Sequence, residues 1–369
     1  MPDPHAPYLS VRTQDQDLAL DVSAVLIEDG DRLIDKATLV VPDPHRPYTD
    51  FVREGWSLQI DLGWTGLHAV VFDGTVTRVR GYAGPNGQRY VTLIAFDLSY
   101  QMNREARSVN HVGTLSAIVQ AVVTAYALPI GAVTVTEDPE FTEAAPLRQS
   151  AETDWLFLQR IAREQGAYAF VEYNEDASKF YFVSAQTLTG TEPIGELDYR
   201  NGNGSLLAFS YKRAAAQATP QRHVTIIDPV SGEMLTAAGA PALPDPPVAA
   251  DTAQADLLGR GGSDLPARYQ AAGELAASQS GNPADQRPIT TLTGVPSDPA
   301  LRSRAKRADP TRTQGWYGTG VAPGMPLLRA KSMLTLGGIG AWADGPWYVE
   351  QARHVVRGAS YLTQFVVTR

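Results

Sequence analysis

Apolar and polar residues alternate with a period of two through most of residues 1–100, for example at residues 58–62 and 91–96. This alternation is typical of β-strands with one buried face. Turn-forming clusters of Asp, Gly, Asn and Pro separate the alternating runs. The clusters lie at residues 28–31, 72–74 and 84–87. We therefore predict a small antiparallel barrel or sandwich over residues 1–100.

The pattern changes after residue 100, where helical periodicity begins. In residues 114–126 the apolar side chains recur three and four positions apart, which places them on one face of a helix. Thr114 can cap the N-terminus of this helix, and Pro129 prevents its continuation. We predict an amphipathic α-helix here.

A second helix is predicted at residues 153–165, where Trp155 belongs to the apolar stripe. Asp154 suits the positive N-terminal end of a helix, and Gly166 suits the left-handed position after its last turn. Two alternating runs follow, at residues 167–173 and 179–184. Residues 101–205 are therefore expected to form an α+β module.

Alternation returns at residues 206–228 and again at residues 315–369. The stretch between them, residues 231–300, is rich in Ala, Gly, Pro and Asp, and such a composition buries little apolar area. We predict an extended insertion, which a short basic helix at residues 299–308 closes. The cationic cluster there suits either a solvated helix face or a nucleic-acid contact. It comprises Arg302, Arg304, Lys306, Arg307 and Arg312.

The two β regions resemble each other. Each has a glycine, a strand, a loop with a tryptophan, an arginine-bearing strand, a turn and a final strand. In the first region these features are Gly55, residues 58–63, Trp64, residues 72–81 and residues 90–96. In the second they are Gly324, residues 333–337, Trp342, residues 348–358 and residues 361–367. Alternation is common in β proteins, so the parallel can arise by chance; otherwise one chain carries two copies of a barrel.

Composition narrows the function classes. The 369 residues exceed what one core usually holds, so two or more domains are expected. The formal charge of -9 argues against a protein whose task is to neutralise nucleic-acid phosphates. The absence of cysteine excludes disulfides and thiolate metal sites. No apolar run approaches the roughly 20 residues of a membrane helix, and no signal peptide is recognised at the start.

The sequence shows no motif of a known catalytic or metal-binding site. The 6 histidines stand apart from one another, without a carboxylate at ligand spacing. His354 lies in a predicted strand and is expected to be a packed or interfacial side chain. We predict no catalytic residue, no cofactor and no metal site. A glycosidase remains an alternative, because it needs only two carboxylates held about 5–10 Å apart.

Three segments carry a family resemblance. Residues 148–166 match a pattern in which Asp-Trp begins a helix and Glu-x-Gly ends it, before an aromatic strand at residues 167–170. Residues 115–128 match a helix that ends in a Tyr-Gly-Leu corner, with Ala127 in place of the glycine. The third segment is residues 324–369. With these segments the chain resembles the late control D family of phage baseplate hubs, which are related to the first half of type VI secretion VgrG proteins.

The resemblance implies a mainly β fold with an α+β insertion: two similar antiparallel tube-like β-barrels and a small helix-containing module. Residues 1–100 would form the first barrel and residues 101–205 the module. The second barrel would be discontinuous, built from residues 206–230 and 315–369, with the Ala/Gly/Pro-rich residues 231–314 inserted.

The resemblance also implies a function, that of a structural baseplate hub in a contractile phage tail or a related injection system. A homotrimer would adapt the six-fold tail tube to a three-fold spike. The expected partners are the tube protein, a separate spike protein, baseplate wedge proteins and the tape measure protein, with DNA or cargo only passing through the channel. The chain would be assembled in the bacterial host cytoplasm and reside in the virion tail baseplate. The alternatives are a tail-tip cell-wall-degrading enzyme and a carbohydrate-binding β module.

Trp64 and Trp342 occupy corresponding loops of the two β regions. Tryptophan is enriched among residues that contribute most to protein interfaces. We expect both residues to anchor contacts with neighbouring subunits or with the tube, or else to plug the mouths of their own barrels.

Overall fold

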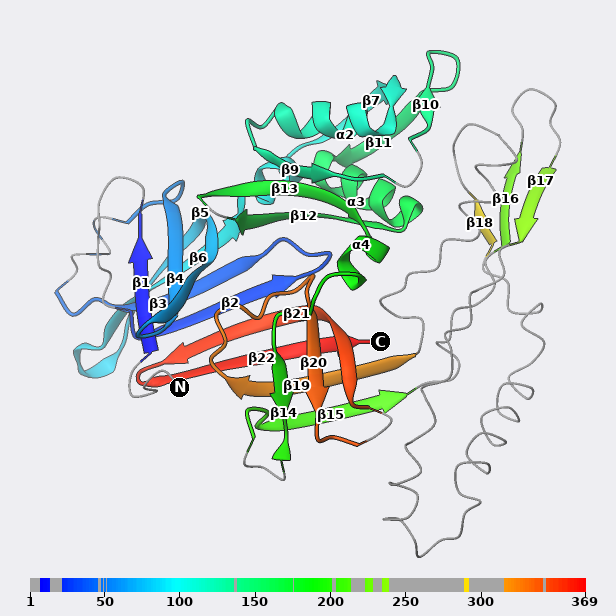
Figure 1. Cartoon of the computed structure of the whole chain (residues 1–369). Coiled ribbons are helices and arrows are strands. Elements are labelled where there is room, and N and C mark those ends of the chain that lie inside the picture. Colours follow the sequence, from blue (N-terminus) through cyan, green and yellow to red (C-terminus); the bar gives the residue numbers. More distant parts are fainter. Residues whose placement is uncertain are drawn as a thin grey trace, which may run out of the picture.

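The computed structural model (Figure 1) describes the side chains of most of the chain and the backbone of three further strands. The fully described residues are 7–13, 22–45, 48, 50, 52–135, 138–174, 176–200, 204–213, 315–340 and 343–369. The further strands are β16 (His223–Ile227), β17 (Met234–Ala238) and β18 (Ile289–Thr291). Trp342 and the cationic cluster at residues 302–312 lie outside the described residues. The same holds for the predicted insertion, residues 231–314, except for the strands β17 and β18.

Six N-terminal strands form the first β unit, in the spatial order β1-β4-β5-β6-β3-β2 with every pair antiparallel. They are β1 (Pro7–Arg12), β2 (Ala24–Gly30), β3 (Lys36–Pro42), β4 (Ser57–Trp64), β5 (Leu67–Ala83) and β6 (Arg89–Asp97). Alternate residues such as Leu39, Leu58 and Leu93 are almost fully buried and form one apolar core. The period-two pattern of the sequence thus corresponds to one buried face.

The second β unit has the order β14-β20-β21-β22-β19-β15. Its strands are β14 (Glu196–Asp198), β15 (Ala208–Arg213), β19 (Trp316–Pro323), β20 (Met333–Gly337), β21 (Gly345–Arg357) and β22 (Ser360–Thr368). Trp347, Leu334 and Val367 are fully buried in its core. This core is distinct from that of the first unit.

The two β units have the same strand order. The sequence parallel predicts that β4, β5 and β6 correspond to β20, β21 and β22. In each unit these three strands are neighbours in the sheet, in this order. The next two strands, β3-β2 and β19-β15, continue each sheet antiparallel in the same order. Only the outermost strand differs, because β1 runs antiparallel to β4 whereas β14 runs parallel to β20. The predicted fold of two similar antiparallel β units is confirmed.

The two units share one 12-stranded sheet, which the prediction of two barrels did not include. β2 pairs antiparallel with β21 over 7 residue pairs, from Ala24 opposite Arg357 to Gly30 opposite Gln351. β2 is the edge strand of the first unit, and its unpaired N–H and C=O groups bond to the C-terminal part of β21, beyond the residues of β21 that pair with β20. In Figure 1 the two units therefore lie side by side as one continuous sheet.

The α+β module lies beside the β units and contains both predicted helices, α2 (Leu115–Thr124) and α3 (Asp154–Gln165) (Figure 1). As expected, Thr114 caps α2, and Gly166 ends α3 with φ 62°. η1 (Pro85–Gly87) belongs to the first β unit, where it turns the β5–β6 hairpin. The other elements, from the end of β6 to α4, are η2 (Leu98–Asn103), β7 (Ala106–His111), β8 (Gly113–Thr114), β9 (Ile130–Val133), β10 (Glu140–Phe141), β11 (Leu147–Thr153), β12 (Ala167–Asn174), β13 (Ala177–Ser184) and α4 (Ala185–Thr189).

Two of the three predicted turns were wrong. Asp29 and Gly30 belong to β2, and Asp73 and Gly74 lie within the long strand β5. Asp-Gly normally favours turns, but Asp29 is buried against cations, and Gly74 is required because a Cβ atom there would lie 2.2 Å from the carbonyl oxygen of Phe96. Tertiary contacts thus override the local signal.

β16 pairs with β17 and β18 in a small separate sheet, and not with the 12-stranded sheet. In the range 206–230, therefore, β15 contributes to the second β unit and β16 does not. β14, which lies within residues 101–205, pairs with β20 of the second unit. Among the described residues, no helix has the length and apolar character needed to cross a membrane.

Candidate functional site

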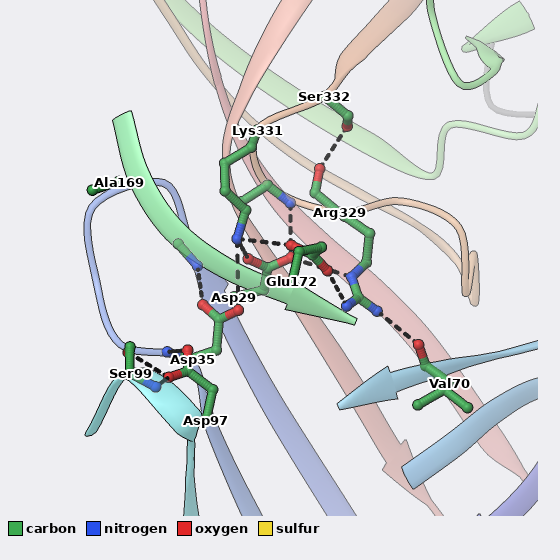
Figure 2. A network of polar contacts seen from close by, with 12 residues as sticks. Asp29, Asp35, Val70, Asp97, Ser99, Ala169, Glu172, Arg329, Lys331 and Ser332 are labelled. Carbon is green, nitrogen blue, oxygen red and sulfur yellow. Dashed lines mark hydrogen bonds and ion pairs between the residues drawn. The ribbon is translucent and has the colours of Figure 1, made fainter. Parts of the chain in front are cut away.

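A buried network of charged side chains lies where the first β unit, the α+β module and the second β unit meet (Figure 2). Lys331, in the segment before β20, is at its centre. Its Nζ lies 2.6 Å from Asp29 Oδ1 on β2, 3.1 Å from Glu172 Oε2 on β12 and 3.6 Å from Asp35 Oδ2. One ammonium group therefore contacts carboxylates from both of the other parts of the molecule.

Arg329 makes a second set of contacts in the same network. It pairs with Glu172 through Nη2, its Nε lies 3.4 Å from Asp29 Oδ2, and Nη1 donates to the carbonyl oxygen of Val70 on β5 at 3.3 Å. The backbone N–H of Ala330 also donates to Asp29 Oδ2, at 2.9 Å. The segment 329–331 is thus held by main-chain and side-chain contacts together.

Asp35 and Asp97 extend the network into the first unit. The backbone N–H of Asp35 donates to Asp97 Oδ2 at 2.9 Å, and that of Gly30 donates to Asp35 Oδ1 at 3.0 Å. Asp97 caps η2 by accepting from the N–H of Ser99 at 2.7 Å. These contacts fix the loop between β2 and β3 against the end of β6.

Burial and the neighbouring charges shift the pKa values of the acidic and basic side chains in the network. Burial would raise the pKa of Asp29, but Lys331 and Arg329 outweigh burial and lower it. Burial and the negative charge of Asp29 hold the pKa of Asp35 well above its ordinary value. Burial also raises the pKa of Asp97, to about 6. The neighbouring carboxylates raise the pKa of Lys331 against the effect of burial. The carboxylates of Glu172 and Asp29 likewise raise the pKa of Arg329 against the effect of burial. Two cations, Lys331 and Arg329, thus face the carboxyl groups of Asp29 and Glu172.

Asp29, Asp35 and Glu172 are close enough for one oxygen atom of each to share a cation. The ammonium of Lys331 lies within 3.6 Å of all three and takes that position. The arrangement is therefore an ion-pair junction between parts of the fold. Breaking a buried junction by removing one partner leaves uncompensated charge, which is strongly destabilising.

Trp64 makes a second contact between the β units. Its Nε1 donates to the carbonyl oxygen of Gly324 at 2.7 Å, and its ring lies 5.6 Å from that of Tyr361 on β22. The side chain is half-buried against the core of the first unit. The structure therefore places Trp64 at an intrachain contact, whereas Trp342, its predicted counterpart, lies outside the described residues.

His354 is the packed side chain that its strand position predicts. It is fully buried, and its Nδ1 lies 2.8 Å from the hydroxyl of Tyr361. Burial, together with Arg329, lowers its pKa to about 3. The imidazole is therefore neutral at physiological pH and belongs to the same inter-unit packing as Trp64.

In the segment with the strongest family resemblance, one side chain is the centre of a hydrogen-bond network. Asp154 is fully buried at the start of α3 and accepts hydrogen bonds from Arg107 Nε at 2.6 Å, Tyr126 Oη at 2.7 Å and Gln149 Nε2 at 2.7 Å. These donors come from β7, the end of α2, and β11. Asp154 therefore does more than favour the helix terminus, because it connects most of the module.

Sequence reasoning missed the Lys331 network. Asp29 was expected in a turn, and its partner Lys331 is 302 residues away. The indirect signal was a cluster of aspartates, at positions 29, 31 and 35, in and beside strands whose alternation predicts a buried face. A buried carboxylate requires a cation or hydrogen-bond donors, but the sequence does not indicate which residues supply them.

Solved structures match this fold over 97–99% of the chain. The tail protein from Neisseria meningitidis MC58 superposes with a TM-score of 0.64 at 11% identity, covering 99% of this chain and 97% of that one. The 43 kDa tail protein of prophage MuSo2 from Shewanella oneidensis gives 0.59 at 13% identity, with 99% and 97% covered. The E. coli c3393 protein, a type VI secretion component, gives 0.57 at 10% identity, with 97% and 76% covered.

A search of curated proteins found no match. The model of the phage tail baseplate hub (GPD) family matches residues 49–244, which is more than half of the chain. This match begins before β4 of the first β unit, covers β4, β5, β6 and the α+β module, and reaches β17, and so it includes Asp154 and Glu172. The protein belongs to the phage tail baseplate hub (GPD) family.

Proposed function

We propose that this hub protein is a homotrimer that adapts a six-fold tail tube to a three-fold spike. One observation carries the proposal: two β units with the same strand order occur in a single chain. Three chains around an axis would present six similar units to the tube while remaining three-fold toward the spike. Closed rotational symmetry of this kind is the usual arrangement of homo-oligomers.

The junction and the shared sheet support this arrangement. If the two units of a chain moved independently of each other, the six units of a trimer would not keep equivalent positions in the ring. Here β2–β21 pairing, the Lys331 network and the Trp64 contact hold the two units of one chain in a single relative orientation. The proposed division of the chain is residues 1–100, the module at 101–205, and a second unit from 206–230 and 315–369 into which 231–314 are inserted; within these ranges β14 pairs with the second unit, and β16 does not.

The partners follow from the same proposal. They are the tail tube protein, a separate spike protein, wedge proteins of the baseplate and the tape measure protein, with DNA or cargo only passing through. A fold relative supports it, since the E. coli c3393 protein exhibits structural similarity to the T4 bacteriophage tail proteins gp27 and gp5. Assembly takes place in the bacterial host cytoplasm, and the assembled protein lies in the virion tail baseplate.

Trp342 anchors a contact with a neighbour, while Trp64 has its indole N–H committed within the chain.

The test is the mass of the purified chain by sedimentation and light scattering, followed by electron microscopy of particles. A trimer with a pseudo-six-fold ring of β units is expected. A stable monomer that binds glycans would favour the carbohydrate-binding alternative. Release of soluble fragments from purified cell walls would favour the cell-wall-degrading enzyme, and no catalytic role is part of the present proposal.

A further inference from the structure

The face of the shared sheet opposite the two cores is continuous across both units. Strand register places Arg80, Thr92, Val40, Ala24 and Arg357 next to one another in a row across β5, β6, β3, β2 and β21. The neighbouring row on the same strands is Arg78, Ile94, Thr38, Leu26 and Val355. We call the face formed by these two rows the outer face.

The middle of the outer face is mainly apolar, with Thr38 and Thr92 as its polar positions, and it is incompletely covered. Val40, Ala24, Leu26, Ile94 and Val355 are all half-buried, whereas the residues that alternate with them, such as Leu39 and Leu93, are at most 1% exposed. A fully solvated sheet face would normally carry polar side chains at these positions. Aliphatic rows left half-exposed across two units indicate a surface that another apolar surface covers.

Cations flank this apolar strip on both sides. Arg78 and Arg80 lie on β5, and Arg353 and Arg357 lie on β21; all four are exposed. Arg353 is paired with Glu28, but Arg78, Arg80 and Arg357 form no ion pair with any residue that the structure describes. In a chain of net charge -9, this strip therefore concentrates unpaired positive charge.

The spacing of the two arginine columns fits a helix. Four strand intervals separate β5 from β21, which is roughly 19 Å at the usual distance between strands. An α-helix with its side chains is about 10–12 Å across, so it fits between the columns with carboxylates on both flanks within reach of the arginines. Its apolar stripe would lie on the aliphatic rows.

We propose that the outer face binds an acidic amphipathic helix of a partner protein. The helix axis follows the strands, leucine-like side chains cover Leu26, Val40 and Val355, and Glu or Asp side chains pair with Arg80 and Arg357. Nucleic acid fits less well, because a phosphate backbone leaves the aliphatic rows uncovered. The inference goes beyond the hub role and does not depend on the number of subunits.

A hollow lies on the same side of the sheet in the second unit. It has a volume of about 410 Å³, and its lining includes Arg353, Gln364, Val366 and Thr319. Gln364 is directly opposite Arg353 across the β21–β22 pair. The hollow thus borders the arginine column on β21, and it can accept a side chain that projects from a helix bound between the columns.

The test uses the full-length chain and a synthetic 21-residue peptide with Leu at positions i, i+3, i+4 and i+7 and Glu at the flanking positions. Binding is followed by fluorescence anisotropy at low salt. R80Q/R357Q is expected to weaken binding roughly tenfold, because two partly exposed ion pairs are lost. The matched control R148Q/R163Q removes two exposed arginines of the module and should leave binding unchanged.

Three outcomes would overturn the proposal. The first is a native chain that does not bind the peptide. The second is binding that does not depend on the apolar stripe: a peptide in which Gln replaces every Leu binds equally well, or a 30-base-pair DNA duplex binds more tightly than the peptide and R80Q/R357Q weakens that binding. Either result would indicate a purely electrostatic surface. The third is a lower particle mass for R80Q/R357Q, which would identify the outer face as a contact between copies of this chain.

Discussion

At the scale of single residues, the junction depends on Lys331. Its side chain is almost fully buried and compensates carboxylates from two other parts of the fold. Its backbone has φ 66°, a left-handed conformation that non-glycine residues rarely adopt. Such a conformation persists only where the surrounding contacts over-determine it, and the N–H of Lys331 donates to the carbonyl oxygen of Val349 at 2.8 Å.

The substitution K331M tests this role. Removing the ammonium leaves Asp29 and Glu172 without their nearest cation, so we expect the free energy of unfolding to fall by about 3–5 kcal/mol. K36M is the matched control, because Lys36 pairs with Glu28 at a partly exposed site and should contribute less than about 1 kcal/mol. Urea unfolding measures both. Equal effects of the two substitutions would contradict a stabilising role for the network.

Asp97 gives the junction a pH dependence of known sign. Because its pKa is raised to about 6, the folded state holds a proton that the unfolded state has already lost above its pKa near 4. Stability should therefore decrease as the pH rises from about 4 to about 6, by about 3 kcal/mol at most. The urea midpoint of the native chain should fall more steeply over this range than that of D97N. Parallel pH profiles would show that Asp97 does not titrate in this way.

At the scale of elements, α2 and α3 were predicted because their signals are local. Thr114 and Gly166 act within one turn of the helix that they cap, whereas Thr153, which caps α3, was expected as the first residue of that helix. The Asp-Gly turns were wrong because burial of Asp29 and the close approach at Gly74 depend on distant strands. The β2–β21 pairing was not predictable, since its partners are more than 300 residues apart and any exposed edge could have accepted β2.

The end of α2 carries a testable departure from the family pattern. Ala127 has φ 53° and is exposed at the corner where the family has glycine. We expect A127G to stabilise the chain by about 0.5–1 kcal/mol, because relief of left-handed strain exceeds the added unfolded-state entropy. The control A125G changes an exposed alanine with φ -60° and should destabilise by up to about 1 kcal/mol. Thermal unfolding distinguishes the two, and destabilisation by A127G would refute the strain argument.

At the scale of the whole molecule, the shared sheet makes one structural body of two units. The resemblance of the two β regions, with β4, β5 and β6 matching β20, β21 and β22, followed from the sequence, because each copy keeps its own alternation and its own core. The way the units join did not, because it is a contact between two strands far apart in the sequence and not a pattern within a segment. The same holds for the outer face, whose rows exist only once β2 and β21 are adjacent.

Hydrogen exchange tests whether the two β units unfold as one body. The amides of β2 and β21 pair at the middle of the 12-stranded sheet, so they should be among the slowest to exchange and should become exposed together. β1 and β15 lie at the two ends of the described strand path and should exchange faster. Independent exposure of β2 and β21 in denaturant would show that the units open separately.

The β2–β21 ladder also has a mechanical consequence. Its hydrogen bonds run perpendicular to the strands, so tension along the strand axes loads all 7 residue pairs in shear at the same time. The chain then transmits force as a stiff plate. In an assembly built from such chains, we therefore expect the boundaries between chains to slide or tilt before the seam inside each chain yields.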